Sequence, residues 1–395
     1  MFILRVLLAI GTLVCVKTAW GGALPENTEK KLSIYIDAGS TGTRLGLYSC
    51  ERDLNAEPIV TELGSISTRS GQGLHEFLPR LEAISDYLEP LLSFAEKKIG
   101  TAQMKEVPIF LYATGGMRTL SKIDQDKIYA EVLSYLQGTR KLKNVFVKSI
   151  EGNEEGLFAW LTVNYHLGNL KESRSSVGVI DMGGETLQIA FELSDRDKRD
   201  YRHVMNITLG GKSRRIYSYS YKGFGQNTLA TENQMIQQLC FDHHHVSSRY
   251  KRCVRLIQEK IKKTCNDPNY CGLGSIPQPR LTGRFVGMGG FIYVAKDLEL
   301  PRYSYQDLMN KSAYVCGMSK EQLYQKLTSN YVDKKDAICF RLSYYFALLY
   351  GKKGGRGLGF SKEDAVELLD TDIAHKSVNW LVGAAYYNSS KLFSQ

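Results

Sequence analysis

Ile36-Asp37-Ala38-Gly39-Ser40-Thr41-Gly42-Thr43-Arg44 has a near copy later in the chain, Ile180-Asp181-Met182-Gly183-Gly184-Glu185-Thr186. In both stretches an apolar run ends in an aspartate and leads into a glycine-bearing turn with hydroxyl side chains, which is typical of a buried strand followed by a turn. Glycine lets backbone N–H groups come close to an anion. A carboxylate beside them would repel phosphate unless a divalent cation, which prefers oxygen ligands, lies between the two. The repeat therefore predicts an α/β fold of two duplicated lobes with a phosphate–cation cleft between them.

The length and composition are those of a globular protein with more than one core. The chain has 395 residues, of which 43% are hydrophobic and 23% charged, and its formal net charge is +10. A chain of this length normally divides into two lobes. Because the sequence has no basic stripe interleaved with aromatic residues, nucleic acid is not expected as a partner. A small polyanionic substrate would account for the positive charge, and dispersed surface Lys and Arg explain it equally well.

Residues 1–23 have the features of a secretory signal peptide. Arg5 precedes the apolar stretch Val6–Val16, and small residues follow at Gly21-Gly22-Ala23. The apolar stretch is too short to span a bilayer, so we expect cleavage near Ala23 and a secreted or periplasmic protein. The sequence has no second apolar run of about 18 residues, the length a membrane helix needs, so no stable membrane anchor is expected.

Export makes disulfides possible for the cysteines that follow the signal peptide. Their spacing contains no CxxC pair, which argues against a zinc site. We expect the pairs Cys240–Cys253, Cys265–Cys271 and Cys316–Cys339, with Cys50 unpaired, although other pairings are compatible with the same spacing.

The order of the predicted elements gives the two lobes their boundaries. We expect residues 33–150 together with 375–395 to form the first lobe, and residues 151–374 to form the second. The second lobe includes a disulfide-stapled insertion at 240–283, rich in Cys, Pro and Lys. Helical spacing is predicted at 80–99, 154–165 and near 380–387, and strands at 107–112 and 145–150. His243-His244-His245 is interpreted as a solvated loop, because three successive residues cannot easily face one metal ion.

The two aspartates are predicted to organise a divalent cation, Mg²⁺ or Ca²⁺, through water. A single aspartate before a glycine would be only a turn cap, but two copies, Asp37 and Asp181, favour the cation role. Arg118 either binds phosphate or pairs with a buried carboxylate. The other phosphate-binding candidates supply hydroxyl, N–H or guanidinium groups and are Gly39, Ser40, Thr41, Gly42, Thr43, Arg44, Thr114, Gly115, Gly183, Gly184 and Glu185.

Two adjacent carboxylates, Glu154 and Glu155, begin a predicted helix and are the candidates for a catalytic base. Adjacent helical residues diverge by about 100°, so only one of them can face the cleft. Acidic residues in a first helical turn are otherwise ordinary helix-dipole partners. On an extended strand Thr186 and Gln188 would share a face. A hydroxyl and an amide there could hold a water in line with a terminal phosphorus while a carboxylate accepts its proton.

Five ordered motifs resemble the apyrase-conserved regions of the nucleoside triphosphate diphosphohydrolases, the ecto-apyrase family related to CD39. The short length and the lack of membrane anchors are similar to the soluble bacterial members. The motifs span roughly residues 33–390 and are Asp37–Arg44, Ala113–Arg118, the block Gly152…Glu155…Trp160…Asn164-Tyr165, Asp181–Gln188, and Trp380-x-x-Gly383.

The resemblance implies an actin-like fold of two lobes, each with a ribonuclease-H-like mixed sheet flanked by helices. It also implies hydrolysis of nucleoside tri- and diphosphates to monophosphates with Mg²⁺ or Ca²⁺. By position, Glu155 is similar to the family's catalytic base, Thr186 to the residue, usually serine, that positions the nucleophilic water, and Gln188 to the amide beside it. Tyr293 falls at the base-stacking position, with its partner expected near residues 331–335.

Glu185 departs from the family pattern, which has a small residue there. Its carboxylate could repel phosphate, recruit metal, or raise the pKa of Glu155. Three other functions remain open: an exopolyphosphatase-like phosphohydrolase with similar Asp-x-Gly turns, a catalytically weak nucleotide-binding protein that interacts with a host surface, and a sugar kinase. Trp160, Asn164-Tyr165 and the export signal argue against the first, and the export signal argues against the last.

Overall fold

A computed structural model describes residues 29–52, 57–68, 71–171, 174–209, 211–231, 233–241, 249–261, 270–327, 335–351, 357–369 and 378–392. The predicted signal peptide, the triple histidine and Cys265 lie outside the described residues. Within them, none of the helices has both the length and the apolar character that crossing a membrane requires.

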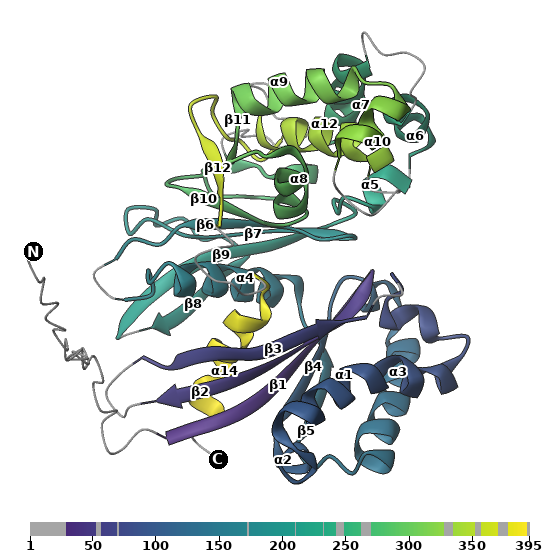
Figure 1. Cartoon of the computed structure of the whole chain (residues 1–395). Helices are drawn as coiled ribbons and strands as arrows, with labels where there is room; N and C mark the ends of the chain where they lie inside the picture. Colours follow the sequence, from purple (N-terminus) through teal and green to yellow (C-terminus); the bar gives the residue numbers. More distant parts are fainter. Residues whose placement is uncertain are drawn as a thin grey trace, which may run out of the picture.

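The first half of the chain forms a five-stranded mixed sheet (Figure 1). Its central strand, β1 (Glu29–Gly39), is buried on both faces, because Ile34 and Ile36 pack into one core cluster and Tyr35 packs into another. β2 runs antiparallel to β1 and β3 runs antiparallel to β2, whereas β4 and β5 on the other side run parallel to β1. The spatial order is β3 (Ile59–Ser67), β2 (Gly42–Arg52), β1 (Glu29–Gly39), β4 (Ile109–Ala113) and β5 (Val145–Ser149).

The second half forms a seven-stranded sheet whose inner five strands repeat this topology. β7 runs antiparallel to β6 and β9 runs antiparallel to β7, whereas β10 and β12 on the other side run parallel to β6. This duplication of strand order and direction confirms two lobes with ribonuclease-H-like sheets. The spatial order is β11 (Arg302–Ser304), β12 (Ala365–Leu368), β10 (Phe285–Gly289), β6 (Gly178–Met182), β7 (Thr186–Glu192), β9 (Lys212–Lys222) and β8 (Val204–Leu209).

Helices cover the outer face of the first sheet. Leu88, Leu91 and Leu92, on one side of the longest of them, α1, pack with Ile34 and Ile36 into one core cluster. The helical segments of this layer are η1 (Leu74–Phe77), η2 (Leu81–Ala83), α1 (Ile84–Ile99), α2 (Thr101–Glu106), η3 (Met117–Thr119), α3 (Lys122–Leu133) and η4 (Ser134–Thr139).

Two disulfides staple the helices of the second half, as predicted. Cys240–Cys253 joins α6 to α7, and Cys316–Cys339 joins α9 to α12. Cys50 is free and buried, also as predicted, and Cys271 is disulfide-bonded. The helical segments here are α5 (Thr228–Thr231), α6 (Gln234–Cys240), α7 (Arg249–Lys260), η6 (Leu273–Ser275), α8 (Gly290–Leu298), α9 (Tyr305–Cys316), α10 (Lys320–Lys326) and α12 (Ile338–Leu349).

Two helices, α4 (Gly152–His166) and α14 (Leu381–Leu392), lie between the sheets (Figure 1). They cross at Gly383, where a Cβ atom would lie 2.0 Å from the backbone oxygen of Phe158. The backbone N–H of Gly383 donates to the Thr162 hydroxyl at 2.8 Å, and Trp380 stacks on Phe158 with ring centroids 6.0 Å apart. This crossing explains the Trp380-x-x-Gly383 motif. The lobe boundaries at residues 150 and 375 stay predictions.

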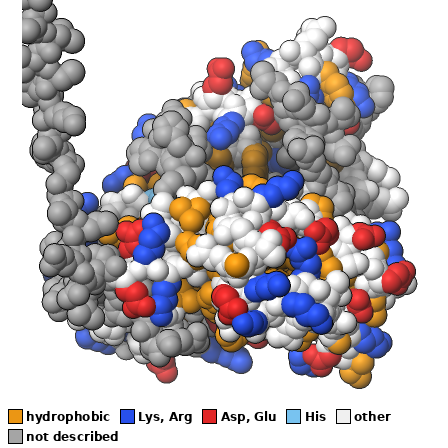
Figure 2. All heavy atoms as spheres, turned by 60° about the horizontal axis from the view of Figure 1, so that its bottom comes forward, with side chains coloured by type: hydrophobic (Ala, Val, Ile, Leu, Met, Phe, Trp, Pro, Cys, Tyr) orange, Lys and Arg blue, Asp and Glu red, His pale blue; other side chains and the backbone are white. Residues whose placement is uncertain are grey.

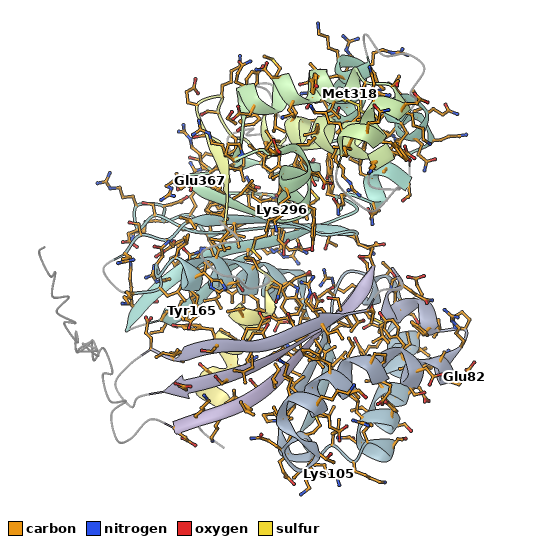
Figure 3. The ribbon with its side chains drawn as sticks, in the orientation of Figure 1. Glu82, Lys105, Tyr165, Lys296, Met318 and Glu367 are labelled. Carbon is orange, nitrogen blue, oxygen red and sulfur yellow. A yellow bond between two sulfur atoms is a disulfide. The ribbon has the colours of Figure 1, made fainter. Side chains whose placement is uncertain are left out.

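Tyr165 links α4 to the edge of the first sheet (Figure 3). Its hydroxyl accepts from the backbone N–H of Val60 at 2.8 Å and donates to the carbonyl of the same residue at 3.1 Å. An edge strand leaves such backbone groups unpaired, so the tyrosine satisfies both and fixes β3 against α4.

Charged side chains of both signs are interspersed on the face shown in Figure 2, without a continuous basic stripe. On this face, therefore, the basic residues are dispersed, as in the second of the two explanations for the positive net charge.

Candidate active site

The two glycine-bearing turns face each other across the space between the sheets. Gly39 pairs with Gly42, so only Ser40 and Thr41 form the first turn. A Cβ atom on Gly184 of the second turn would lie 3.0 Å from Cγ2 of Thr41 and 3.1 Å from Oγ of Ser40. The two turns thus approach each other closely from the two lobes, and the phosphate–cation cleft between them stays a prediction.

The ends of β4 and β10 add two more glycine segments to the same cleft. A Cβ atom on Gly115 would lie 3.2 Å from Cβ of Glu185 and 3.3 Å from Cγ2 of Thr186. Gly289 has a φ of +60°, and a Cβ atom there would lie 2.6 Å from Oδ1 of Asp181. Glycine is needed at position 289, where φ is positive and the neighbouring strand leaves no room for a Cβ atom, whereas at position 115 a Cβ atom would make only a tight contact with the opposite turn. Thr114 is buried beside Gly115, and its N–H donates to the carbonyl of Ala38 at 3.1 Å.

Three carboxylates from the two lobes share this cleft. Burial raises the pKa of Asp37 and of Asp181 to about 7, and in both cases the negative charge of Glu155 raises it while Arg44 lowers it. Burial also raises the pKa of Glu155, against the opposing effect of Arg118. Since each group acts electrostatically on the others, the predicted cation carboxylates and the predicted base lie in one region.

The structure separates the roles of the adjacent glutamates. Glu154 caps its own helix by accepting from the backbone N–H of Glu151 at 2.9 Å, and it pairs with Lys148 at 2.8 Å. Glu155 is 7% exposed and accepts from Nη2 of Arg118 at 2.9 Å. The helix-dipole interpretation therefore fits Glu154, and Arg118 pairs with a buried carboxylate.

Two glycines bring α4 close to the second sheet. Cβ atoms on Gly152 and Gly156 would lie 2.3 Å from Cβ of Ser220 and 2.4 Å from Oγ of Ser218, respectively. Because no larger residue fits at either position, these glycines set the depth at which Glu155 enters the cleft.

Thr186 and Gln188 point to the same side of β7 and are both buried. Nε2 of Gln188 donates to Oγ1 of Thr186 at 2.7 Å and to Oγ of Ser220 at 3.1 Å. The same amide hydrogen-bonds Glu155, which lowers the pKa of that carboxyl. The hydroxyl, the amide and the carboxylate are thus brought together as the sequence predicts.

The donor set fits a hydrated divalent cation. Oδ1 of Asp37 is buried and has no hydrogen-bond partner among the described residues. The part of the chain that the structure describes holds no group of three or more His, Cys, Asp or Glu side chains able to bind a metal. Hard cations such as Mg²⁺ keep several waters and complete their shell with substrate phosphates, so two carboxylates are sufficient.

Of the two residues predicted to bind the nucleotide base, the structure describes Tyr293. Tyr293 is 50% exposed on α8, the helix that follows Gly289-Gly290. Its expected partner near residues 331–335 falls largely outside the described residues.

Sequence reasoning missed the segment after β9. The backbone N–H of Gly225 donates to the carbonyl of Glu185 at 3.1 Å, and those of Gln226 and Asn227 donate to Gly183 and Gly184, each at 3.0 Å. These bonds fix the second turn from behind. The only signal in the sequence is the glycine pair in Gly223-Phe224-Gly225.

Comparison with known proteins places the chain in a family. A model of the GDA1/CD39 (nucleoside phosphatase) family matches residues 23–243 and 240–394. The chain is 26% identical over 412 residues to the nucleoside-triphosphatase ntp-1 of Caenorhabditis elegans, covering 92% of this chain and 74% of that protein. It is 25% identical over 439 residues to the nucleoside-diphosphatase mig-23 of Caenorhabditis briggsae, covering 92% and 78%.

A solved structure agrees with the topology. The structure of nucleoside triphosphate hydrolases from Neospora caninum superposes with a TM-score of 0.61 over 91% of this chain and 92% of that chain, at 12% sequence identity. This likeness and the duplicated sheet order confirm the actin-like fold of two lobes. Because the family model covers almost all of the sequence, the chain belongs to the GDA1/CD39 (nucleoside phosphatase) family, the CD39-related family that its five motifs resemble.

Proposed function

We propose that this protein is an apyrase that hydrolyses nucleoside tri- and diphosphates to monophosphates, with Glu155 as the general base. The observation that carries the proposal is the position of Glu155, buried in the same cleft as Asp37 and Asp181 and next to the two opposed turns. Activity on both substrate classes is further supported by the similarity to a nucleoside-triphosphatase and a nucleoside-diphosphatase.

In this mechanism a water molecule attacks the terminal phosphorus in line with the leaving group. Its oxygen forms the new P–O bond, Glu155 accepts its proton, and the bond to the bridging oxygen breaks, releasing the shortened nucleotide. Thr186 and Gln188 hold the water, because their hydroxyl and amide lie beside Glu155. A base must be unprotonated to act, and the ion pair with Arg118 favours that form.

The phosphate chain is held by the turn residues of both lobes. The donors are the backbone N–H groups and hydroxyls of Ser40 and Thr41, the hydroxyls of Thr43 and Thr114, the guanidinium of Arg44, and the N–H groups of Gly115, Gly184 and Glu185. Tyr293 is the base-stacking residue. The close approach of the two turns lets donors from both lobes hold the same phosphate chain.

Asp37 and Asp181 hold Mg²⁺ or Ca²⁺ through water in this proposal. When bound, such a cation neutralises charge on the phosphate oxygens. The protein is secreted with residues 1–23 as its signal peptide, and the two disulfides support an oxidising compartment.

A substrate panel tests the proposal. Purified protein is incubated with ATP, ADP, GTP and polyphosphate, with Mg²⁺ or Ca²⁺ and then with a chelator, and phosphate release is measured. We expect cation-dependent release from ATP and ADP, loss of most turnover in Glu155→Gln, and retained nucleotide binding in that variant. Release from polyphosphate alone would favour an exopolyphosphatase, and binding without any release would favour a catalytically weak nucleotide-binding protein.

A further inference from the structure

Each sheet carries the same row of three residues across its antiparallel strands, at the edge that faces the cleft. In the first sheet Asp37 on β1 pairs with Arg44 on β2, which pairs with Ser67 on β3. In the second sheet Asp181 on β6 pairs with Gln188 on β7, which pairs with Ser220 on β9. The aspartate, the long polar side chain and the serine thus occupy equivalent places in both repeats.

The serine makes the same contact in both rows. Nε of Arg44 donates to Oγ of Ser67 at 3.1 Å, and Nε2 of Gln188 donates to Oγ of Ser220 at 3.1 Å. Neighbouring side chains on one face of an antiparallel pair routinely interact. Here the contact holds the far end of a side chain with three or more rotatable bonds, which would otherwise keep considerable rotamer freedom.

In the second row the tethered group is the amide that contacts Thr186 and Glu155. Gln188 is 2% exposed, and its amide nitrogen donates to Oγ1 of Thr186 and to Oγ of Ser220, while the same amide lowers the pKa of Glu155. The Ser220 hydroxyl accepts from this amide and so restrains its orientation. In the first row the tethered group is the Arg44 guanidinium, which lowers the pKa of both Asp37 and Asp181.

We propose that Ser220 and Ser67 are positioning residues of the two lobes. Ser220 orients Gln188 for the water, and Ser67 orients Arg44 for the phosphate chain. The proposal rests on the proposed function, because it assigns the two rows to the two halves of one hydrolysis reaction. Since water is activated only in the transition state whereas phosphate is bound in the ground state as well, the two serines should affect different kinetic constants.

The test is a kinetic comparison of Ser220→Ala, Ser67→Ala and the control Ser218→Ala. Alanine keeps the Cβ atom that packs against Gly152 and removes only the hydroxyl. Ser218 lies on the same strand and also packs against α4, but it pairs with Ala190 in the sheet, and its hydroxyl donates to the backbone carbonyl of Asn153 at 2.7 Å. It therefore controls for the general effect of a lost hydroxyl on β9.

With ATP and Mg²⁺ we expect Ser220→Ala to lower kcat about tenfold, the value of one net hydrogen bond, with KM changed less than about twofold. For Ser67→Ala we expect KM to rise about threefold with kcat nearly unchanged, because its contact is more exposed. Ser218→Ala should change kcat by less than about twofold. Combined with Gln188→Ala, the Ser220→Ala substitution should add less than a twofold loss, because the group that it positions is absent.

The thermal unfolding midpoint of each variant is measured as well, to establish that the kinetic constants are compared on folded protein. An unchanged kcat in Ser220→Ala, an equal loss in Ser218→Ala, or a full additional loss in the Gln188→Ala background would overturn the inference and leave the proposed function intact. Absence of phosphate release from the wild-type protein would instead overturn the proposed function itself.

Discussion

Arg118 lies with its Nη2 atom 2.9 Å from Oε2 of Glu155, and its Nη1 atom donates to the backbone carbonyl of Ile150 at 3.0 Å. Arg118 follows β4 of the first sheet, whereas Glu155 stands on α4 at the second sheet. The guanidinium therefore connects the proposed base to the opposite lobe. Breaking a largely buried ion pair costs more than a surface pair, because a charge is left without a partner.

Replacing Arg118 by leucine should make activity more sensitive to acid. Arg118 lowers the pKa of Glu155, and the base acts unprotonated, so removing the guanidinium raises that pKa and reduces the active fraction as the pH falls. We expect kcat/KM to drop about tenfold at neutral pH, with a loss that grows toward pH 5. The pH profile of kcat/KM measures this. Arg118→Lys, which keeps the charge, should retain the wild-type profile, and a uniform loss across the pH range would contradict the role.

Cation binding should stabilise the protein more at neutral than at acidic pH. The pKa values of Asp37 and Asp181 are raised to about 7 in the folded state, so between about pH 4 and pH 7 the folded protein holds protons that the unfolded chain has lost. Without cation, the contribution of these two carboxyls to stability is therefore fully present below about pH 4 and is lost as the pH rises through 7. A three-unit shift of one carboxyl corresponds to about 4 kcal/mol.

The thermal unfolding midpoint with and without Mg²⁺ or Ca²⁺ at pH 5 and pH 7.5 measures this effect. The cation binds the ionised carboxylates, so the stabilisation it brings should be larger at pH 7.5. Asp181→Asn should raise the midpoint of the cation-free protein at pH 7.5 and abolish most of the response, whereas Asp126→Asn, in an exposed pair with Lys122, should leave both unchanged. An equal response at both pH values would argue against a carboxylate-bound cation.

The sequence predicted the strands and turns that carry the site because their signals are local. An apolar run, an aspartate and a glycine turn occur within nine residues, and the same pattern recurs in the second half. The disulfides Cys240–Cys253 and Cys316–Cys339 were also correct, since each joins cysteines close in sequence. The local helix pattern alone did not separate Glu154 from Glu155, and only the family resemblance favoured Glu155, because the two environments depend on Lys148 and Arg118.

Local sequence signals could not have identified Ser67 on β3 or Ser220 on β9. Ser67 and Ser220 reach their partners through strand register, and a single serine in a polar strand has no distinguishing pattern. The backbone bonds from residues 225–227 to the second turn are likewise set by tertiary packing. Contacts between elements distant in sequence are the part of the site that local periodicity leaves undetermined.

Glu185 should weaken the binding of nucleotide that carries no cation. Its Cβ lies close to Gly115 in the cleft, and among the described residues it has no ion-pair partner. It is absent from the charges that raise the pKa of Glu155, which favours repulsion of phosphate over an effect on the base. The affinity for a fluorescent nucleotide analogue, measured in the presence of a chelator, should become about tenfold higher in Glu185→Gln than in the wild type at low salt. Glu154→Gln, whose carboxylate faces Lys148, is the control, and equal affinities in all three proteins would contradict the repulsion.

Gly383→Ala should destabilise the whole molecule by forcing α14 away from α4. The added Cβ would lie 2.0 Å from the carbonyl oxygen of Phe158, a backbone atom that cannot yield without moving the helix. Overpacking of this kind costs about 1–3 kcal/mol, which lowers the denaturant midpoint in an unfolding titration. Gly138→Ala is the matched control, because its nearest neighbour, Oγ of Ser134, would be 3.9 Å away, and it should unfold like the wild type. Since α4 also carries Glu155, the folded Gly383→Ala protein should lose turnover as well; a variant of wild-type stability would mean that the two helices do not cross in contact.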